Sequence, residues 1–125
     1  MKKKILVVDD ESDIIYILKT VLSRRGYAVI NAGSGEECLK VVKSERPDLI
    51  FMDIMMDGMD GWEAARRIKT DPKTRDIPIS MLSVKSWSDD RKKSREYAYA
   101  DMHLKKPIDF GELLDTTENM LSREN

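Results

Sequence analysis

The sequence predicts an α/β fold in which a five-stranded parallel sheet is covered by helices on both faces. Short apolar runs such as residues 5–8 and 49–52 alternate with segments whose apolar residues recur at helical spacing. These runs lack the polar alternation of a strand with one wet face, so we expect them to be buried on both sides. Strict alternation of strands and helices is typical of parallel sheets.

Each element has its own signal in the chain. The predicted strands cover residues 5–8, 27–31, 49–52, 77–82 and 102–104. The predicted helices cover residues 14–22, 34–42, 60–71, 89–98 and 109–121. Ser34, Asp60, Ser88 and Asp109 stand at the starts of the last four helices, where a short side-chain oxygen can accept from the first turn; Ser34 also begins a capping box.

Length, charge and cysteine content narrow the class of protein. A chain of 125 residues with 41% hydrophobic residues suits one domain, expected here over residues 1–125. The 22 Lys and Arg nearly balance the 23 Asp and Glu, so net charge does not favour nucleic acid. One cysteine, Cys38, and one histidine, His103, cannot build a disulfide framework or a Cys/His zinc site within one chain.

The first residues of the chain and its cysteine content bear on where in the cell the protein is found. Its first apolar run, residues 5–8, is too short for a signal peptide or a membrane span. A single cysteine fits a reducing compartment. We therefore expect a soluble, cytoplasmic protein that binds neither a membrane nor nucleic acid directly.

The carboxyl ends of the predicted strands carry the reactive side chains. Ligands bind at this edge of open parallel sheets, where the strand order reverses. The first strand runs into Asp9 and Asp10, the third into Asp53, the fourth into Ser83 and the fifth into Lys106. Carboxylates that leave water together need a compensating cation, and Mg²⁺ prefers oxygen ligands. The sequence therefore predicts a magnesium site at this edge.

Phosphoryl transfer suits this set of side chains. A cation, an ammonium and a hydroxyl aimed at one point would stabilise a transferring phosphoryl group, and a carboxylate can accept it covalently. Asp53 is the best-placed acceptor. Taken singly, Asp9 and Asp10 could be helix caps and Lys106 a solvated charge. The joint pattern favours the site.

Five motifs in order resemble the response-regulator receiver domain of two-component signalling, of the stand-alone, chemotaxis-regulator-like type. They are "ILVVDD" at 5–10, "PDLIFMDIMM" at 47–56, "GMDGWE" at 58–63, "IPISMLS" at 77–83 and "LKKPID" at 104–109. The resemblance covers nearly the whole chain. It implies a flavodoxin-like, doubly wound fold and a phosphorylation-dependent switch that catalyses only its own phosphoryl transfer and hydrolysis.

The resemblance also implies a role for each acidic residue of the site. Asp53 would take a phosphoryl group from a sensor histidine kinase or a phosphotransfer protein. Asp9 and Asp10, with Asp53 and the backbone carbonyl of Met55, would hold Mg²⁺, and Asp10 is expected to be a direct ligand.

Four further residues have implied roles. Lys106 would pair with a phosphoryl oxygen, and Pro107 would follow a cis peptide bond. Ser83 would turn inward to bond the phosphoryl group, and His103, at the position of an aromatic switch residue, would follow it. A separate downstream protein is the implied reader, because no output domain follows in this chain, and a homodimer formed on phosphorylation is a further implied possibility.

Some alternatives stay open. Asp57 stands where relatives commonly carry proline, which keeps open a docking module that is insensitive to phosphorylation. A small phosphatase with an aspartate nucleophile is a second alternative, but it would need an aspartate two positions after the first-strand nucleophile, where Glu11 follows Asp9. His103 could also be a half-buried strand residue without a switching role.

Overall fold

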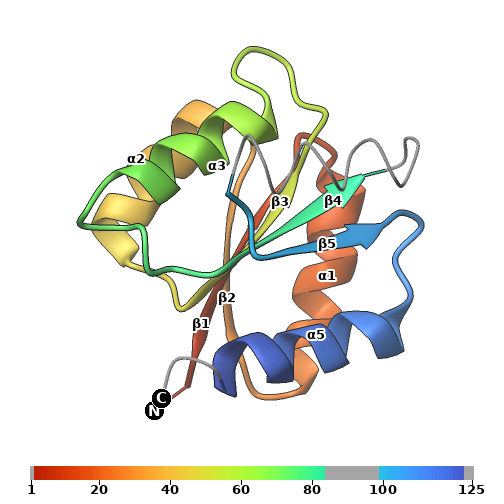
Figure 1. The fold of residues 1–125 in the computed structure, drawn as a ribbon. Coiled ribbons are helices and arrows are strands. Elements are labelled where there is room, and N and C mark those ends of the chain that lie inside the picture. Colours follow the sequence, from red (N-terminus) through yellow and green to blue (C-terminus); the bar gives the residue numbers. More distant parts are fainter. Residues whose placement is uncertain (1, 84–98, 123–125) are drawn as a thin grey trace.

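A five-stranded parallel sheet lies between two layers of helices in the computed structural model, which describes residues 2–83 and 99–122 (Figure 1). The strands are β1 (Lys4–Val8), β2 (Ala28–Ala32), β3 (Leu49–Asp53), β4 (Ile79–Ser83) and β5 (Met102–Lys105). The described helices are α1 (Ser12–Arg24), α2 (Gly35–Glu45), α3 (Gly61–Thr70) and α5 (Phe110–Ser122). The helix predicted over 89–98 and its cap Ser88 lie outside the described residues. The predicted fold class is confirmed.

The strand order is β2-β1-β3-β4-β5, and every neighbouring pair is parallel. The order reverses at β1, because the chain moves to one side of it for β2 and to the other side for β3. In the β1–β3 register Val8 pairs with Met52. Asp9 and Asp53, the next residues on the two strands, are therefore brought together at the switch point of the sheet.

Alternating side chains on the strands build two cores. Leu6 and Val8 pack toward α2 and α3, whereas Ile5 and Val7 pack toward α1 and α5. All residues of β3 and β4 are buried, which explains their lack of polar alternation. The core under α2 includes Cys38, and burial raises the pKa of its thiol to about 12, so the thiol remains protonated.

The predicted caps form hydrogen bonds to their helices. Ser34 Oγ accepts from the backbone N–H of Glu37 (3.1 Å), and the Glu37 carboxylate accepts in turn from the N–H of Gly33. The return bond thus reaches one residue before the cap itself. Asp60 and Asp109 each accept from the third residue of their helices at 2.9 Å.

Two strands begin later than predicted, because their expected first residues belong to turns. The N–H of Tyr27 donates to Leu22 O at the end of α1 (3.4 Å), so β2 begins at Ala28. The N–H of Ile77 donates to Thr74 O (3.0 Å), and the following proline has no N–H, so β4 begins two residues later than expected. Their far ends, like those of the third and fifth strands, extend one residue beyond the predicted limits.

Lys69 fastens the connection between α3 and β4. Its side chain is only 8% exposed, and its ammonium lies 2.7 Å from Ile77 O, 3.2 Å from Arg75 O and 2.7 Å from Asp101 Oδ2. The same Asp101 oxygen accepts from the N–H of Ile79 (2.8 Å). One ammonium therefore ties the end of α3 to the turn before β4 and to the residue before β5.

Replacing this lysine is expected to destabilise the fold. In Lys69→Ala, two carbonyls and a carboxylate lose their donor, and we expect the free energy of unfolding to fall by about 2 kcal/mol. Urea unfolding measures the change. Lys40→Ala is the matched control, since the exposed side chain of this lysine on α2 makes no hydrogen bond or ion pair within the described part of the chain. An equal loss in both variants would contradict the role given to Lys69.

Candidate functional site

Three carboxylates and one ammonium meet where β1 and β3 end. Asp9 is fully buried, Asp53 is 4% exposed, and Asp10 beside them is exposed. One carboxylate oxygen from each lies within 4.8 Å of the others. Lys106, which is 97 positions from Asp9 in the chain, places its Nζ 2.8 Å from Asp9 Oδ2 and 3.3 Å from Asp53 Oδ1. Four of the predicted site residues are therefore in one cluster.

Backbone bonds fix the Asp53 carboxylate at the end of β3. The N–H of Ile54 donates to Leu82 O on β4 (3.0 Å) and continues the sheet one residue past the strand. The N–H of Met55 then points back to Asp53 Oδ1 at 3.4 Å. Met55 is 48% exposed, and its hydrogen bond to the site is made by its backbone.

Asp9 serves two neighbours at once. Its Oδ1 accepts at 2.9 Å from the N–H of Glu11, the residue just before α1, and its Oδ2 accepts from Lys106. The bond from Glu11 precedes the first residue of α1, and no side chain caps this helix, so the capping alternative does not describe Asp9. Asp9 couples the start of α1 to the site.

Ser83 and His103 are both buried near this edge. Ser83 ends β4 with 1% exposed, and its carbonyl accepts from the N–H of Lys106 (2.7 Å). His103 is 7% exposed in β5 and pairs in register with Met81. The peptide bond between Lys106 and Pro107 is cis, as the resemblance implies. The switching roles of Ser83 and His103 stay predictions.

Gly61 is a site residue that the sequence reasoning missed. A Cβ at this position would lie 2.1 Å from Asp53 O and 2.9 Å from the Ile54 Cα. The N–H of Gly61 donates to Ile54 O (3.0 Å), which closes the loop between β3 and α3. The available signal was a glycine directly after the capping Asp60, at a position where a side chain would be expected in a helix. Asp57, in the same loop, is exposed and is not part of the carboxylate cluster.

The charges of the site do not balance. Three carboxylates face one ammonium, so two negative charges are in excess. Burial and the charge of Asp9 raise the pKa of Asp53 to about 6, although Lys106 opposes the change. Burial alone would lower the pKa of Lys106, but its contacts with Asp9 and Asp53 outweigh this and raise it, so it stays cationic. A hard divalent cation fits this donor set, because it prefers oxygen ligands and would neutralise the excess charge.

The match to a family model identifies the class of protein. Residues 5–118 match the response regulator receiver domain, and the chain belongs to this family. Receiver domains act as regulators in two-component systems and are not classical enzymes. Phosphorylation and Mg²⁺ are characteristic of the family, which generally binds the ion at an acidic pocket. Receiver domains interact with histidine kinases or phosphotransfer proteins.

Curated relatives of two lengths resemble the chain. It is 32% identical to the protein PilH of Pseudomonas aeruginosa, over 95% of this chain and 98% of that protein. It is 42% identical to the alkaline phosphatase synthesis transcriptional regulatory protein PhoP of Bacillus subtilis, over 86% of this chain and 44% of that protein. The chain spans about half the length of several curated relatives that it matches, as the 49% coverage of the Porphyridium aerugineum transcriptional regulator ycf27 illustrates.

Solved structures confirm the receiver fold. A putative response regulator from Chloroflexus aurantiacus superposes with a TM-score of 0.93 at 32% identity, covering 98% of this chain and 99% of that one. A chemotaxis response regulator of Vibrio cholerae superposes with a TM-score of 0.90 at 28% identity, covering 97% and 100%. In residues 2–83 and 99–122, no helix is both long and apolar enough to cross a membrane.

The raised pKa of Asp53 predicts how stability depends on pH. A carboxyl whose pKa is about 6 in the folded chain, against 3.8 ordinarily, binds its proton more tightly when folded, so its favourable contribution is full below pH 3.8 and is lost as the pH rises through 6. In metal-free protein, Asp53→Asn should therefore raise the free energy of unfolding by on the order of 2 kcal/mol above about pH 7 and change it little near pH 4. Urea unfolding in a chelator, repeated across this range, measures both. A difference that does not vary with pH would contradict the assignment.

Proposed function

We propose that this receiver domain is a phosphorylation-dependent switch in which Asp53 accepts a phosphoryl group from a phosphohistidine of a sensor histidine kinase or phosphotransfer protein. The observation that carries the proposal is the buried contact between Asp53 Oδ1 and Lys106 Nζ (3.3 Å), beside the carboxylates of Asp9 and Asp10. This contact supplies a nucleophile with a cation already next to it. The protein catalyses only its own phosphoryl transfer and hydrolysis.

The chemistry follows from these positions. An Asp53 carboxylate oxygen forms the new bond to phosphorus while the bond from phosphorus to the donor imidazole nitrogen breaks. The electron pair of the broken bond stays on that nitrogen, so a donor ring that is protonated on its other nitrogen leaves as neutral imidazole. The Lys106 ammonium pairs with a phosphoryl oxygen, and the Ser83 hydroxyl donates to another. Both groups stabilise charge in a place from which water is largely excluded.

The metal ligands in this proposal are Asp9, Asp10, Asp53 and the backbone carbonyl of Met55. Mg²⁺ held by them would supply positive charge next to the phosphoryl oxygens. The Asp10 carboxylate is the exposed member of the cluster, so it can bind directly without losing a protein partner. Asp9 already accepts two hydrogen bonds, one of which comes from Lys106.

An apolar groove beside Lys106 suits docking of the phosphoryl donor. It has a volume of about 210 Å³ and lies between α1 and the segment that follows β5. Ile17 on one side and Phe110 on the other are 41% and 47% exposed. A helical donor that covers these two side chains would present its phosphohistidine next to Asp53.

The output of the switch would come from Ser83 and His103. Once Asp53 is phosphorylated, the Ser83 hydroxyl turns toward the new phosphoryl oxygen. The neighbouring β5 strand then adjusts, and the buried His103 changes its rotamer. The surface near β5 and α5 thereby changes its affinity for a downstream protein or for a second copy of the chain.

Intact mass spectrometry tests the proposal. After incubation with acetyl phosphate and Mg²⁺, the wild-type protein should gain a single phosphoryl group, and Asp53→Asn should gain none. Chelation of the metal should also abolish the adduct, because excess negative charge then opposes the incoming phosphoryl group. Asp57→Asn is the matched control, since it removes an exposed acid from the same loop and should keep the adduct.

Two results would contradict the proposal, and each would point to a different explanation. A folded, Mg²⁺-loaded wild type without an adduct would favour the phosphorylation-insensitive docking module, and Asp57→Pro would then be the first variant to make. An adduct that persists in Asp53→Asn would assign the acceptor role to another side chain.

A further inference from the structure

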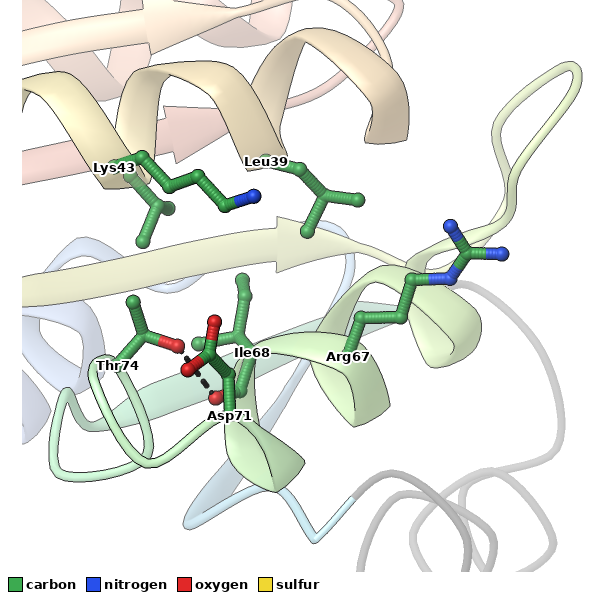
Figure 2. Close-up of a pocket in the computed structure, with 7 residues that line it drawn as sticks. Leu39, Lys43, Arg67, Ile68, Asp71 and Thr74 are labelled. Atoms are coloured by element: carbon green, nitrogen blue, oxygen red, sulfur yellow. Dashed lines mark hydrogen bonds between the residues drawn. The ribbon is translucent and has the colours of Figure 1, made fainter.

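A groove with basic side chains along its rim runs between the carboxyl-terminal ends of α2 and α3. It consists of two adjoining hollows that share Lys43, Asp71 and Thr74. The first hollow has a volume of about 170 Å³, and the second, of about 420 Å³, extends past Arg46 and Lys73. In Figure 2, the Lys43 side chain extends along α2 toward Leu39, above Thr74, Asp71 and Ile68.

The floor of the first hollow is apolar. Leu39 and Val42 on α2 face Ile68 on α3, and Figure 2 shows Leu39 and Ile68 pointing toward one another from the two helices. An apolar cavity of about 150 Å³ holds a benzene molecule in another protein, so a hollow of this size can take one leucine or phenylalanine side chain. The shape therefore suits a ligand with one large apolar group.

The rim is rich in unused positive charge. Lys43, Arg46, Arg67 and Lys73 face a single carboxylate, that of Asp71. Arg67 pairs with a glutamate of its own helix, but the other three cations form no ion pair in the described part of the chain. The Asp71 Oδ1 already accepts from the N–H of Lys73 (2.9 Å). Three cations are thus available to an anionic ligand.

The backbone conformation of Arg46 also supports a role for this residue in the groove. Its φ of 48° and ψ of 64° are left-handed, and its N–H caps α2 by donating to Val42 O (3.0 Å). Glycine or asparagine usually occupies this position after a helix, because other side chains are strained there. The chain keeps an arginine at a place that disfavours it, and the residue lines the groove.

The groove is separate from the site around Asp53. Each helix runs antiparallel to the strand before it, so the carboxyl-terminal ends of α2 and α3 lie at the edge of the sheet where the strands begin (Figure 1). Asp53 lies at the edge where the strands end. A ligand in the groove therefore approaches from the opposite edge and leaves the phosphoryl site open.

We propose that this groove binds an acidic segment of a partner protein, whose single large apolar side chain enters the hollow between Leu39 and Ile68. Carboxylates on either side of that residue pair with Lys43, Arg46 and Lys73. The concave shape disfavours a flat bilayer, and the apolar floor disfavours a nucleic acid backbone. Binding is independent of the phosphorylation state of Asp53 and gives the domain a constant attachment point.

Fluorescence anisotropy with synthetic peptides tests the proposal. The probes are a set of labelled peptides in which one phenylalanine is flanked by glutamates at varied spacing. Two comparison peptides carry alanine in place of the phenylalanine or lysines in place of the glutamates, and a short labelled oligonucleotide provides the nucleic acid comparison. At low ionic strength we expect saturable binding of at least one acidic, phenylalanine-containing peptide and at least about tenfold weaker binding of each comparison probe.

Protein variants locate the binding site. Lys43→Glu and Arg46→Glu should each weaken the peptide affinity by about tenfold, and Leu39→Ala should do so only for the phenylalanine-containing peptide. Arg46→Gly is the most informative change, because it should relieve the left-handed strain, hold or raise the thermal midpoint, and still weaken binding. Lys40→Glu, on the same helix outside the groove, is the matched control and should leave the affinity unchanged, as should Asp53→Asn.

Several results would overturn the proposal. These are the absence of saturable binding by every peptide of the set, equal binding of the oligonucleotide, or an equal loss of affinity in Lys40→Glu and Lys43→Glu. Retained affinity in a folded Arg46→Gly would remove Arg46 from the site and, with it, the explanation of its conformation. None of these results bears on whether Asp53 is phosphorylated.

Discussion

The structure depends on positive charge reaching carboxylates that end two buried strands. β1 and β3 are apolar on both faces, yet they run directly into Asp9 and end on Asp53, and neither carboxylate would leave water without compensation. Lys106 provides part of it from the end of β5, which lies beyond β4 in the sheet. The strand order that packs the two cores is therefore also the order that brings the ammonium to the acids. One strand order therefore accounts for both the packing of the cores and the position of the site.

Much of the fold could be predicted from the sequence, because buried parallel strands and amphipathic helices have different periods and the caps are local. Three helix caps could be recognised from the sequence of the first helical turn alone, namely Ser34, Asp60 and Asp109. The limits of β2 and β4 could not be predicted, since Tyr27 and Ile77 have strand-like side chains but use their N–H groups in turns. Neither residue's side chain carries that information.

The candidate site was predictable in a different sense. Its residues follow the strands, and parallel topology alone brings the strand ends to one edge of the sheet. Asp9, Asp53 and Lys106 could therefore be assigned to one site before any interatomic distance was known. Three features were not predicted from the sequence. They are the two hydrogen bonds that the Asp9 carboxylate accepts, the contacts of the Lys69 ammonium with three oxygen atoms, and the groove beside Arg46. Each depends on the close approach of segments that no periodicity relates, and on which atom of a side chain meets which neighbour.

Gly61 links β3 to the next helix without a side chain between them. Its backbone lies so close to Asp53 O that a single carbon atom would not fit, and its N–H is bonded to Ile54 O. Here the end of β3 and the first turn of α3 meet through backbone atoms alone, so a displacement of the Asp53 peptide would have to move the start of α3 with it.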